Sequence, residues 1–449
     1  MGRLFGTDGV RGIANQELTP LLAFYLGRAA AAVLGKGQKG VAILGRDTRL
    51  SGSMLAAALT AGVTSTGCDL LDAGVIPTPG IAYLTRNLGA TFGVVISASH
   101  NPFDDNGIKF FSQEGTKLPD EVEDEIEALV LTALAGQVAD FPTATGREIG
   151  RAESLADAHE RWMGFLTGTA TEDLSGLRIV VDCANGAASS VAPQVYRRLG
   201  AEVITINAEP DGVNINAQCG STHPAALCQA VVAHQATVGL AHDGDADRVI
   251  AVDEQGRIVD GDGIMAICAL DLLEKGKLAK GTLVATQYSN MGLADLLKRQ
   301  GAQLLFVENG DRYVWEAMVQ NRLNLGGEKS GHIIFADHST TGDGILTAIQ
   351  LLSVLKKKGV PLSQLASVLQ FYPQKLVNVP VKDKNFAQNL EVSGAIARAQ
   401  GLLGEEGRIF VRASGTEPLI RVMAEAKDEQ VLEEVVSLVA EVIAAQLGA

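Results

Sequence analysis

Residues 92–102 read Phe-Gly-Val-Val-Ile-Ser-Ala-Ser-His-Asn-Pro, an apolar run followed by small and turn-forming residues. The run 92–96 predicts a buried strand of a parallel sheet. The two serines then stand at the carboxyl end of that strand, where open α/β sheets bind their ligands. An ordinary turn, in which the side chains of Ser97 and Ser99 hydrogen-bond to backbone groups, explains the hexapeptide 97–102 equally well. Residues elsewhere in the chain decide whether this segment is a catalytic loop or a structural turn.

The composition is that of a folded α/β protein with more than one domain. The chain has 449 residues, of which 47% are hydrophobic and 20% charged, and this length is too great for a single compact core. The formal net charge of -15 argues against a nucleic-acid partner or an anionic membrane surface, because both require a basic face. A small anionic substrate is compatible with this charge if cationic side chains gather in one cleft.

The cysteines predict a reducing compartment. They are an odd number, widely spaced, and include no Cys-x-x-Cys pair: Cys68, Cys183, Cys219, Cys228 and Cys268. We therefore expect free thiols and a cytoplasmic protein. No apolar leader precedes Arg11, and no uncharged run is long enough to cross a bilayer, so we expect neither export nor membrane insertion.

Apolar runs alternate with helical segments along most of the chain. Helices are expected at 20–34, 53–66 and 120–135, a rigid turn at 75–80, and further strands at 41–44, 178–182, 202–206, 238–241, 249–252, 283–286 and 304–307. This rhythm is typical of βα units. We expect four domains, with the boundaries 1–151, 152–252, 253–366 and 367–449.

Three aspartates lie between two of these apolar runs. Asp243, Asp245 and Asp247 alternate with small residues, so their carboxylates converge if the loop curls. Such a set suits a hard divalent cation, Mg²⁺ above all, and leaves room for phosphate oxygens. An EF-hand calcium loop is disfavoured, because Arg248 stands where that loop needs glycine and a β-run follows it. A solvated acidic turn without a cation is the other alternative, at the cost of strong mutual repulsion.

A serine and a divalent cation together predict phosphoryl transfer. Ser99, once phosphorylated, would give its phosphoryl group to a substrate hydroxyl. The reaction needs a base, and Lys109 or His100 lies within reach, although a lysine in a strand more often faces solvent. Arg11, in the glycine-punctuated stretch 5–12, either contacts a phosphate or belongs to a flexible turn.

A second phosphate site is expected near the carboxyl terminus. Ser414, Gly415 and Thr416 supply hydroxyls and backbone N–H groups in a nest-like loop, flanked by Arg412 and Arg421. A Ser-Gly-Thr turn without such a role is the alternative, and the two arginines favour phosphate binding.

One loop carries groups suited to sugar hydroxyls. Glu328, Ser330 and His332 alternate, so their side chains would point the same way from an extended segment. We expect this triplet to contact a substrate, although His332 alone would more often be structural.

The order of these loops resembles the α-D-phosphohexomutase family. The stretches concerned are Ser-Ala-Ser-His-Asn-Pro at 97–102, Asp-Gly-Asp-Ala-Asp-Arg at 243–248, Gly-Glu-Lys-Ser-Gly-His at 327–332 and Arg-Ala-Ser-Gly-Thr-Glu-Pro at 412–418. The likeness runs almost from end to end. Further stretches at 6–12, 182–187, 220–224 and 309–313 are similar to the bacterial branch that acts on glucosamine phosphates.

The resemblance implies three related α/β domains and a smaller C-terminal α+β domain around a central cleft. It implies interconversion of glucosamine 6-phosphate and glucosamine 1-phosphate through a 1,6-bisphosphate, in the synthesis of UDP-N-acetylglucosamine and the cell wall. It also implies a cytoplasmic monomer or homodimer that binds a phosphosugar. A phosphoglucomutase or phosphomannomutase of the same fold, and a phosphosugar-binding protein without catalysis, are the alternatives.

The resemblance also assigns roles to the residues. Ser99 would be the phosphoserine, and it would hold Mg²⁺ together with Asp243, Asp245 and Asp247. Ser99, His100, Lys109 and Arg11 would form the catalytic set, with His100 and Lys109 as the acid/base candidates and Arg11 in contact with a phosphate. The residues expected to bind the substrate are Arg248, Glu328, Ser330, His332, Arg412, Ser414, Gly415, Thr416 and Arg421.

Overall fold

The computed structural model describes residues 4–6, 8–36, 39–414 and 418–448. The chain forms two compact units, each built from two separate stretches. The first unit is Met1–Tyr288 with Ala302–Val368, and the second is Ser289–Gly301 with Leu369–Ala449. Among the described residues, three sheets lie in the first unit and one in the second.

The first sheet contains the strand on which the sequence argument began. Its order is β1-β2-β6-β5-β3-β4-β7, with β1 (Phe5–Gly6), β2 (Gly9–Ile13), β3 (Val41–Arg46), β4 (Asp69–Val75), β5 (Phe92–Ile96), β6 (Asp105–Phe111) and β7 (Ala152–Ser154). Every residue of β5 is buried, as predicted. The sheet is mixed rather than parallel, however, because β5 pairs in parallel with β3 and antiparallel with β6.

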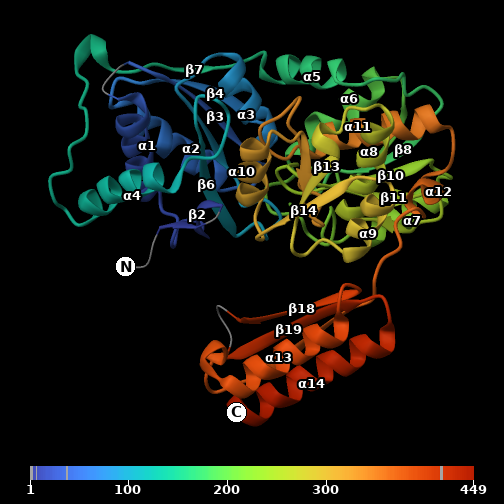
Figure 1. The fold of residues 1–449 in the computed structure, drawn as a ribbon. Coiled ribbons are helices and arrows are strands. Elements are labelled where there is room, and N and C mark those ends of the chain that lie inside the picture. Colours follow the sequence, from blue (N-terminus) through green and yellow to red (C-terminus); the bar gives the residue numbers. More distant parts are fainter. Residues whose placement is uncertain (1–3, 7, 37–38, 415–417, 449) are drawn as a thin grey trace. The chain divides into compact units, whose positions relative to one another are not determined.

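Helices cover both faces of this sheet (Figure 1). On one face α1 (Pro20–Gly35), α2 (Gly52–Thr64) and α4 (Asp120–Leu134) share a hydrophobic core with β3 and β5. On the other lies α3 (Thr78–Asn87), where the sequence predicted only a rigid turn. A proline in the first turn of a helix loses no hydrogen bond, since the first N–H groups have no helical partner, so Pro79 is compatible with this start.

Two further sheets complete the first unit. One has the order β12-β11-β10-β8-β9 and the other β14-β13-β15-β16. Their strands are β8 (Arg178–Asp182), β9 (Glu202–Ile206), β10 (Val238–His242), β11 (Val249–Asp253), β12 (Ile258–Val259), β13 (Thr282–Thr286), β14 (Gln303–Val307), β15 (Leu325–Gly327) and β16 (Ile333–Phe335). The accompanying helices are α5 (Ala158–Gly168), α6 (Ala192–Arg198), α7 (Ala225–Ala233), α8 (Gly261–Glu274), α10 (Asp311–Asn321), α11 (Gly344–Lys358) and α12 (Leu362–Ala366).

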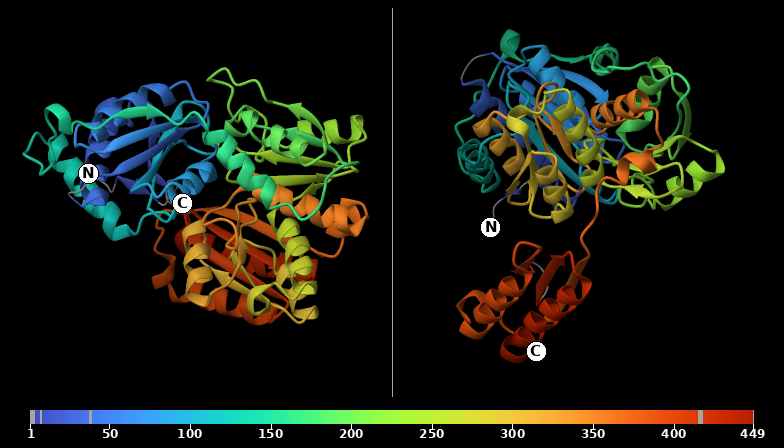
Figure 2. Two further views of the ribbon diagram at one scale, coloured as in Figure 1. Left: turned by 90° about the horizontal axis from the view of Figure 1, so that it is seen from above. Right: turned by 45° about the vertical axis from the view of Figure 1, so that its right-hand side comes forward.

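The second unit is a three-stranded antiparallel sheet backed by helices. The strands β17 (Gln374–Pro380), β18 (Gly407–Ala413) and β19 (Leu419–Ala426) are arranged in the order β17-β19-β18. The helices α13 (Leu390–Leu403) and α14 (Glu429–Leu447) lie against one face of this sheet (Figures 1 and 2). Val435, Val439 and Ile443 of α14 are fully buried and form the apolar side of this helix.

The second unit also takes in α9 (Met291–Arg299), which lies between β13 and β14 in the sequence. The side chain of Asn290 accepts a hydrogen bond from Tyr372 N at 2.8 Å and donates one to Tyr372 O at 3.0 Å. Met291 N donates to Glu425 Oε1 at 3.1 Å. This helix is therefore built into the C-terminal unit by hydrogen bonds at its amino end.

All five cysteines are free, as the sequence predicted. Across the described part of the chain, every helix is too short or too polar to span a bilayer.

Candidate active site

Ser99 lies three residues after the end of β5 and is almost completely buried. Its backbone adopts the left-handed conformation, with φ 51°. The hydroxyl donates to Asp243 Oδ2 at 2.7 Å, and Oγ lies 3.3 Å from His100 Nδ1. The serine therefore contacts the first of the three aspartates, from which it is separated by 144 residues in the chain.

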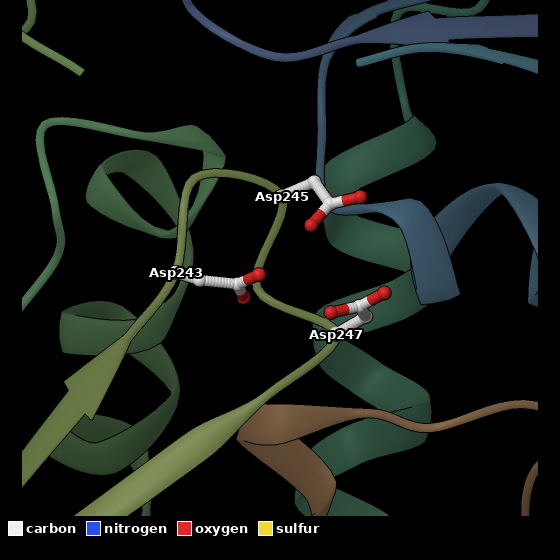
Figure 3. A group of neighbouring side chains, drawn as sticks. All are labelled: Asp243, Asp245 and Asp247. Carbon is white, nitrogen blue, oxygen red and sulfur yellow. The ribbon is translucent and has the colours of Figure 1, made fainter. Parts of the chain in front are cut away.

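The three aspartates form one buried cluster on the loop between β10 and β11 (Figure 3). One oxygen from each of Asp243, Asp245 and Asp247 lies within 4.8 Å of the others. Asp245 Oδ1 and Asp247 Oδ1 are buried without a hydrogen-bond partner in the described structure. Buried carboxylate oxygens that lack donors fit a bound divalent cation, because oxygen ligands of high charge are what such an ion requires.

The carboxylates of this cluster differ in their electrostatic environment. Burial, together with the neighbouring charges of Asp247 and Asp245, raises the pKa of Asp243 well above its ordinary value. Burial also disfavours ionised Asp245, but the Lys109 ammonium and a hydrogen bond from Thr78 outweigh it and hold its pKa below the ordinary range. Lys109 Nζ lies 3.1 Å and Thr78 Oγ1 2.6 Å from Asp245 Oδ2.

The pKa values of Lys109 and His100, the two predicted acid/base residues, are shifted in opposite directions. Lys109 is only 5% exposed on β6, so the solvent-facing alternative is wrong. Burial disfavours its ammonium, but Asp245 and Asp247 outweigh burial and raise its pKa. For His100, burial and the charges of Arg248 and Arg11 lower the pKa. The raised pKa of Lys109 favours its protonated amine, and the lowered pKa of His100 favours its neutral imidazole.

Two predicted arginines also lie in the first unit. Arg11 is on β2, with Nη2 3.6 Å from Asp8 Oδ2. Arg248 follows the metal loop, with Nε 3.7 Å from Asp247 Oδ1. In both side chains the buried Nε makes no hydrogen bond to a described residue. Guanidinium groups with unused donors suit an oxyanion such as a phosphate.

The predicted sugar loop joins β15 to β16. Ser330 Oγ donates to Glu328 Oε2 at 3.1 Å. His332 is 3% exposed, and its Nε2 lies 3.6 Å from Asp311 Oδ2 and 4.0 Å from Asp247 Oδ2. A Cβ at Gly342 would lie 2.5 Å from three atoms of the imidazole, so this glycine makes room for the ring. Glu328 and Ser330 are half-buried and His332 is buried, with its Nε2 close to Asp247 of the metal loop.

Sequence reasoning missed a charged network beside this loop. Lys117 Nζ contacts Asp311 Oδ2 at 2.7 Å and Asp8 Oδ1 at 3.2 Å. Because Asp311 also lies near His332, the network extends from the amino-terminal segment to the sugar loop. Asp311 stands in the stretch 309–313 that supported the family resemblance, whereas nothing in the sequence around Lys117 distinguished it from a surface lysine.

The predicted phosphate loop belongs to the second unit. Arg412 on β18 stands directly opposite Arg421 on β19, which places both guanidinium groups on one face of the sheet. Ser414 N donates to Leu419 O at 2.9 Å, and Ser414 O accepts from Lys384 Nζ at 2.9 Å. Gly415 and Thr416 lie outside the described residues.

Comparisons with known proteins give the family of the chain. Four profiles match successive parts of it, and all carry the description phosphoglucomutase/phosphomannomutase. They are alpha/beta/alpha domain I over residues 2–136, domain II over 160–256, domain III over 260–372 and the C-terminal domain over 376–442. The chain belongs to the phosphoglucomutase/phosphomannomutase family. The predicted fold class, three α/β domains followed by a C-terminal domain, is confirmed.

Relatives and solved structures cover the whole chain. A protein of Pelotomaculum thermopropionicum named phosphoglucosamine mutase is 58% identical over 99% of both chains. A phosphoglucomutase/phosphomannomutase family protein of Burkholderia thailandensis has a TM-score of 0.83 at 23% identity and covers 99% of this chain and 97% of its own. The N-acetylphosphoglucosamine mutase of Aspergillus fumigatus, in complex with GlcNAc-6P and magnesium, has a TM-score of 0.68 at 18% identity over 98% and 95%. These two structures share the family fold.

Proposed function

We propose that this protein interconverts glucosamine 6-phosphate and glucosamine 1-phosphate through a phosphoserine at Ser99. The observation that carries the proposal is the buried Ser99 hydroxyl, 2.7 Å from Asp243 within a three-carboxylate cluster. The choice of sugar is supported by the relatives, because proteins 51% to 58% identical over nearly the full chain are named phosphoglucosamine mutase.

In the first step the phosphoryl group moves from Ser99 to the free hydroxyl of the sugar phosphate. The bond from phosphorus to Ser99 Oγ breaks as a bond from phosphorus to the sugar oxygen forms. The sugar hydroxyl gives up its proton and Ser99 Oγ gains one. We assign the acceptor to His100, which is neutral, and the donor to Lys109, which is protonated.

The second step reverses these roles on the other phosphate of the 1,6-bisphosphate. Lys109, now neutral, takes the Ser99 proton, and protonated His100 gives one to the sugar oxygen that leaves. Both residues then regain their starting states, and Ser99 is phosphorylated again. The 1,6-bisphosphate is the product of the first transfer and the substrate of the second. It therefore has to reorient within the site between the two steps.

Several side chains are proposed to hold the substrate and a metal ion. Asp243, Asp245 and Asp247, with the phosphorylated Ser99, would bind Mg²⁺, whose charge stabilises the phosphoryl oxygens during transfer. The metal is supported by the orphaned oxygens of the cluster and by the magnesium in the Aspergillus fumigatus structure. The proposed substrate contacts are Arg11, Arg248, Glu328, Ser330, His332, Arg412, Ser414, Gly415, Thr416 and Arg421.

We also propose the domain boundaries 1–151, 152–252, 253–366 and 367–449, and a cytoplasmic monomer or homodimer. The net charge of -15 supports the proposal that neither nucleic acid nor a membrane is a partner.

The decisive experiment is a mutase assay with Mg²⁺ and a trace of the matching 1,6-bisphosphate. Glucosamine, glucose and mannose 6-phosphates are compared at equal concentration. We expect a clear preference for the amino sugar. Preference for glucose or mannose would move the protein to a sister activity of the same fold, and binding without turnover on all three would make it a phosphosugar-binding protein.

A further inference from the structure

Arg49 contacts the backbone of the Ser99 loop with almost its whole guanidinium group. It follows β3, and its side chain is fully buried with that of Asp47. Nε donates to Asp47 Oδ2 at 2.9 Å. The remaining donors go to the carbonyl oxygens of Ser99 at 3.0 Å, Asn101 at 2.8 Å, Asp105 at 3.0 Å, and Pro102. Since a guanidinium has five N–H groups, every donor of Arg49 is used.

Asn216, which lies between β9 and α7, contacts two of the same carbonyl oxygens. Its Nδ2 donates to Ser99 O at 2.8 Å and to Asn101 O at 3.0 Å. Each of these oxygens therefore accepts two hydrogen bonds, one from Arg49 and one from Asn216. Asn216 is buried and itself adopts a left-handed backbone, with φ 58°.

The metal loop meets the same junction through Gly244. A Cβ on this residue would lie 2.6 Å from Ser99 O and 2.9 Å from Asn216 Nδ2. The backbone between Asp243 and Asp245 thus packs against the carbonyl that Arg49 and Asn216 hold. The position of that carbonyl is coupled to the distance between the serine and the metal loop.

The Ser99 backbone needs such support. A left-handed conformation is unfavourable for a residue with a Cβ, so it persists only where the surroundings enforce it. Ser99 N also donates to Ser97 Oγ at 3.0 Å, and Ser97 Oγ donates to Asp47 Oδ2 at 2.6 Å. Asp47, the partner of Arg49, is therefore linked to the amide as well as to the carbonyl of the loop.

We infer that Arg49 and Asn216 are positioning residues for phosphoryl transfer, which hold the Ser99 loop in the one backbone conformation that places Oγ against Asp243. The inference rests on the proposed function. Neither residue touches the Ser99 side chain through a described hydrogen bond, so their effect is exerted through the loop's carbonyl oxygens. Errors of about 1 Å in the placement of a reacting atom lower rates by about a hundredfold.

The test uses Asn216→Gly in the full-length protein. Glycine adopts φ 58° without strain, so the variant removes the two hydrogen bonds and keeps the turn. Gln235→Gly is the matched control, because Gln235 has φ 49° and is exposed in the turn after α7. We measure kcat and KM on glucosamine 6-phosphate with Mg²⁺, and amide hydrogen exchange in the peptide spanning 97–105.

We expect Asn216→Gly to lower kcat by about tenfold to a hundredfold, with KM within about twofold of the wild-type value. Exchange at the amides of Ser99 and Asn101 should become about ten times faster. The control should match the wild type in both measurements. Arg49→Lys provides a second variant with the same expected pattern, because an ammonium cannot reach four carbonyl groups from one point.

A wild-type kcat in Asn216→Gly, a loss confined to KM, or unchanged loop exchange would each overturn the inference. Failure of the proposed function is distinguishable. In that case the wild-type protein turns over none of the sugar phosphates, and the positioning role can no longer concern phosphoryl transfer. Hydrogen exchange in Asn216→Gly still decides whether Asn216 holds the loop.

Discussion

The serine loop and the metal loop are both buried and both follow the carboxyl end of a strand, yet their hydrogen bonding is opposite. In the serine loop, the carbonyl oxygens of Ser99 and Asn101 each accept two hydrogen bonds. In the metal loop, Asp245 Oδ1 and Asp247 Oδ1 accept none from described residues. The carbonyl oxygens of the serine loop are thus paired twice by the protein, whereas two carboxylate oxygens of the metal loop have no protein donor.

The difference shows how the two loops divide the work. A group that must be placed needs a rigid surround, because placement is lost when the backbone can move. A group that must bind an ion needs ligand atoms that no protein donor already occupies. A phosphoserine beside a cation requires both features. The carbonyl oxygen of Ser99 accepts two hydrogen bonds, and one oxygen each of Asp245 and Asp247 has no protein donor.

The strongest way to break the comparison is Ser99→Ala. We expect mutase activity to fall by at least about ten-thousandfold, because the covalent carrier of the phosphoryl group is removed. The carbonyl contacts of the loop are kept, so the unfolding temperature should stay within about 3 °C. Ser393→Ala, at an exposed position of α13, serves as the control and should be fully active. Retention of a tenth of the activity would remove Ser99 from the mechanism.

Removal of divalent cations tests the other loop. A chelator should reduce turnover by about a thousandfold, since the loss of a metal withdraws several kcal/mol of charge stabilisation. Mg²⁺ should restore it. The unfolding temperature should also rise with Mg²⁺ concentration in the wild type, because binding to the folded state alone stabilises it. An unfolding temperature indifferent to Mg²⁺ would contradict the assignment of the cluster.

Two aspartates within the metal loop should respond in opposite directions. In the presence of chelator, Asp245→Asn should lower the free energy of unfolding by about 3 kcal/mol, because it leaves the buried Lys109 ammonium without its partner. Asp243→Asn should raise it by about 1 kcal/mol, since it removes the carboxylate that burial and the charges of Asp247 and Asp245 disfavour. Urea unfolding of the two metal-free variants measures both values. Equal effects of the two substitutions would mean that the two carboxylates do not differ in their electrostatic environment.

The junction of the loops can be probed by a smaller change, Gly244→Ala. The added methyl group meets Ser99 O and Ile215 Cδ1 at 2.6 and 2.8 Å, and overpacking of this kind costs about 2 kcal/mol of unfolding free energy. Gly164→Ala is the control, because a Cβ there meets nothing within 4 Å on α5. The control should be neutral or slightly stabilising. Equal stability of both variants would show that the two loops do not pack as tightly as the distances indicate.

The sequence was sufficient for several buried strands and for the residues with unusual side-chain patterns. The strands at 92–96, 178–182 and 202–206 have the predicted bounds, because continuous apolar runs between turn residues leave little choice of period. The three aspartates and Ser99 were predicted to act together, and the structure places Asp243 in contact with Ser99.

The residues that support these groups were not predictable in the same way. Arg49 and Asn216 bind carbonyl oxygens, which every residue carries, so no pattern of side chains marks their partners. The burial of Lys109 was hidden for another reason. An alternating strand predicts one covered face, whereas β6 is buried on both faces from Asn106 to Phe111. The helix α3 was missed because Pro77, just before it, and Pro79, in its first turn, were taken for a turn.

The C-terminal unit cannot be separated from the rest by a single cut. Glu425 is fully buried and binds both Met291 N and Arg408, and Asn290 pairs with Tyr372. A fragment that begins at Leu369 would contain Glu425 and Tyr372 but would lack Met291 and Asn290, which hydrogen-bond to them. During synthesis, α9 leaves the ribosome before any of residues 369–449 exist to receive it. The C-terminal unit can therefore be completed only at the end of translation. It does not correspond to one continuous stretch of the sequence.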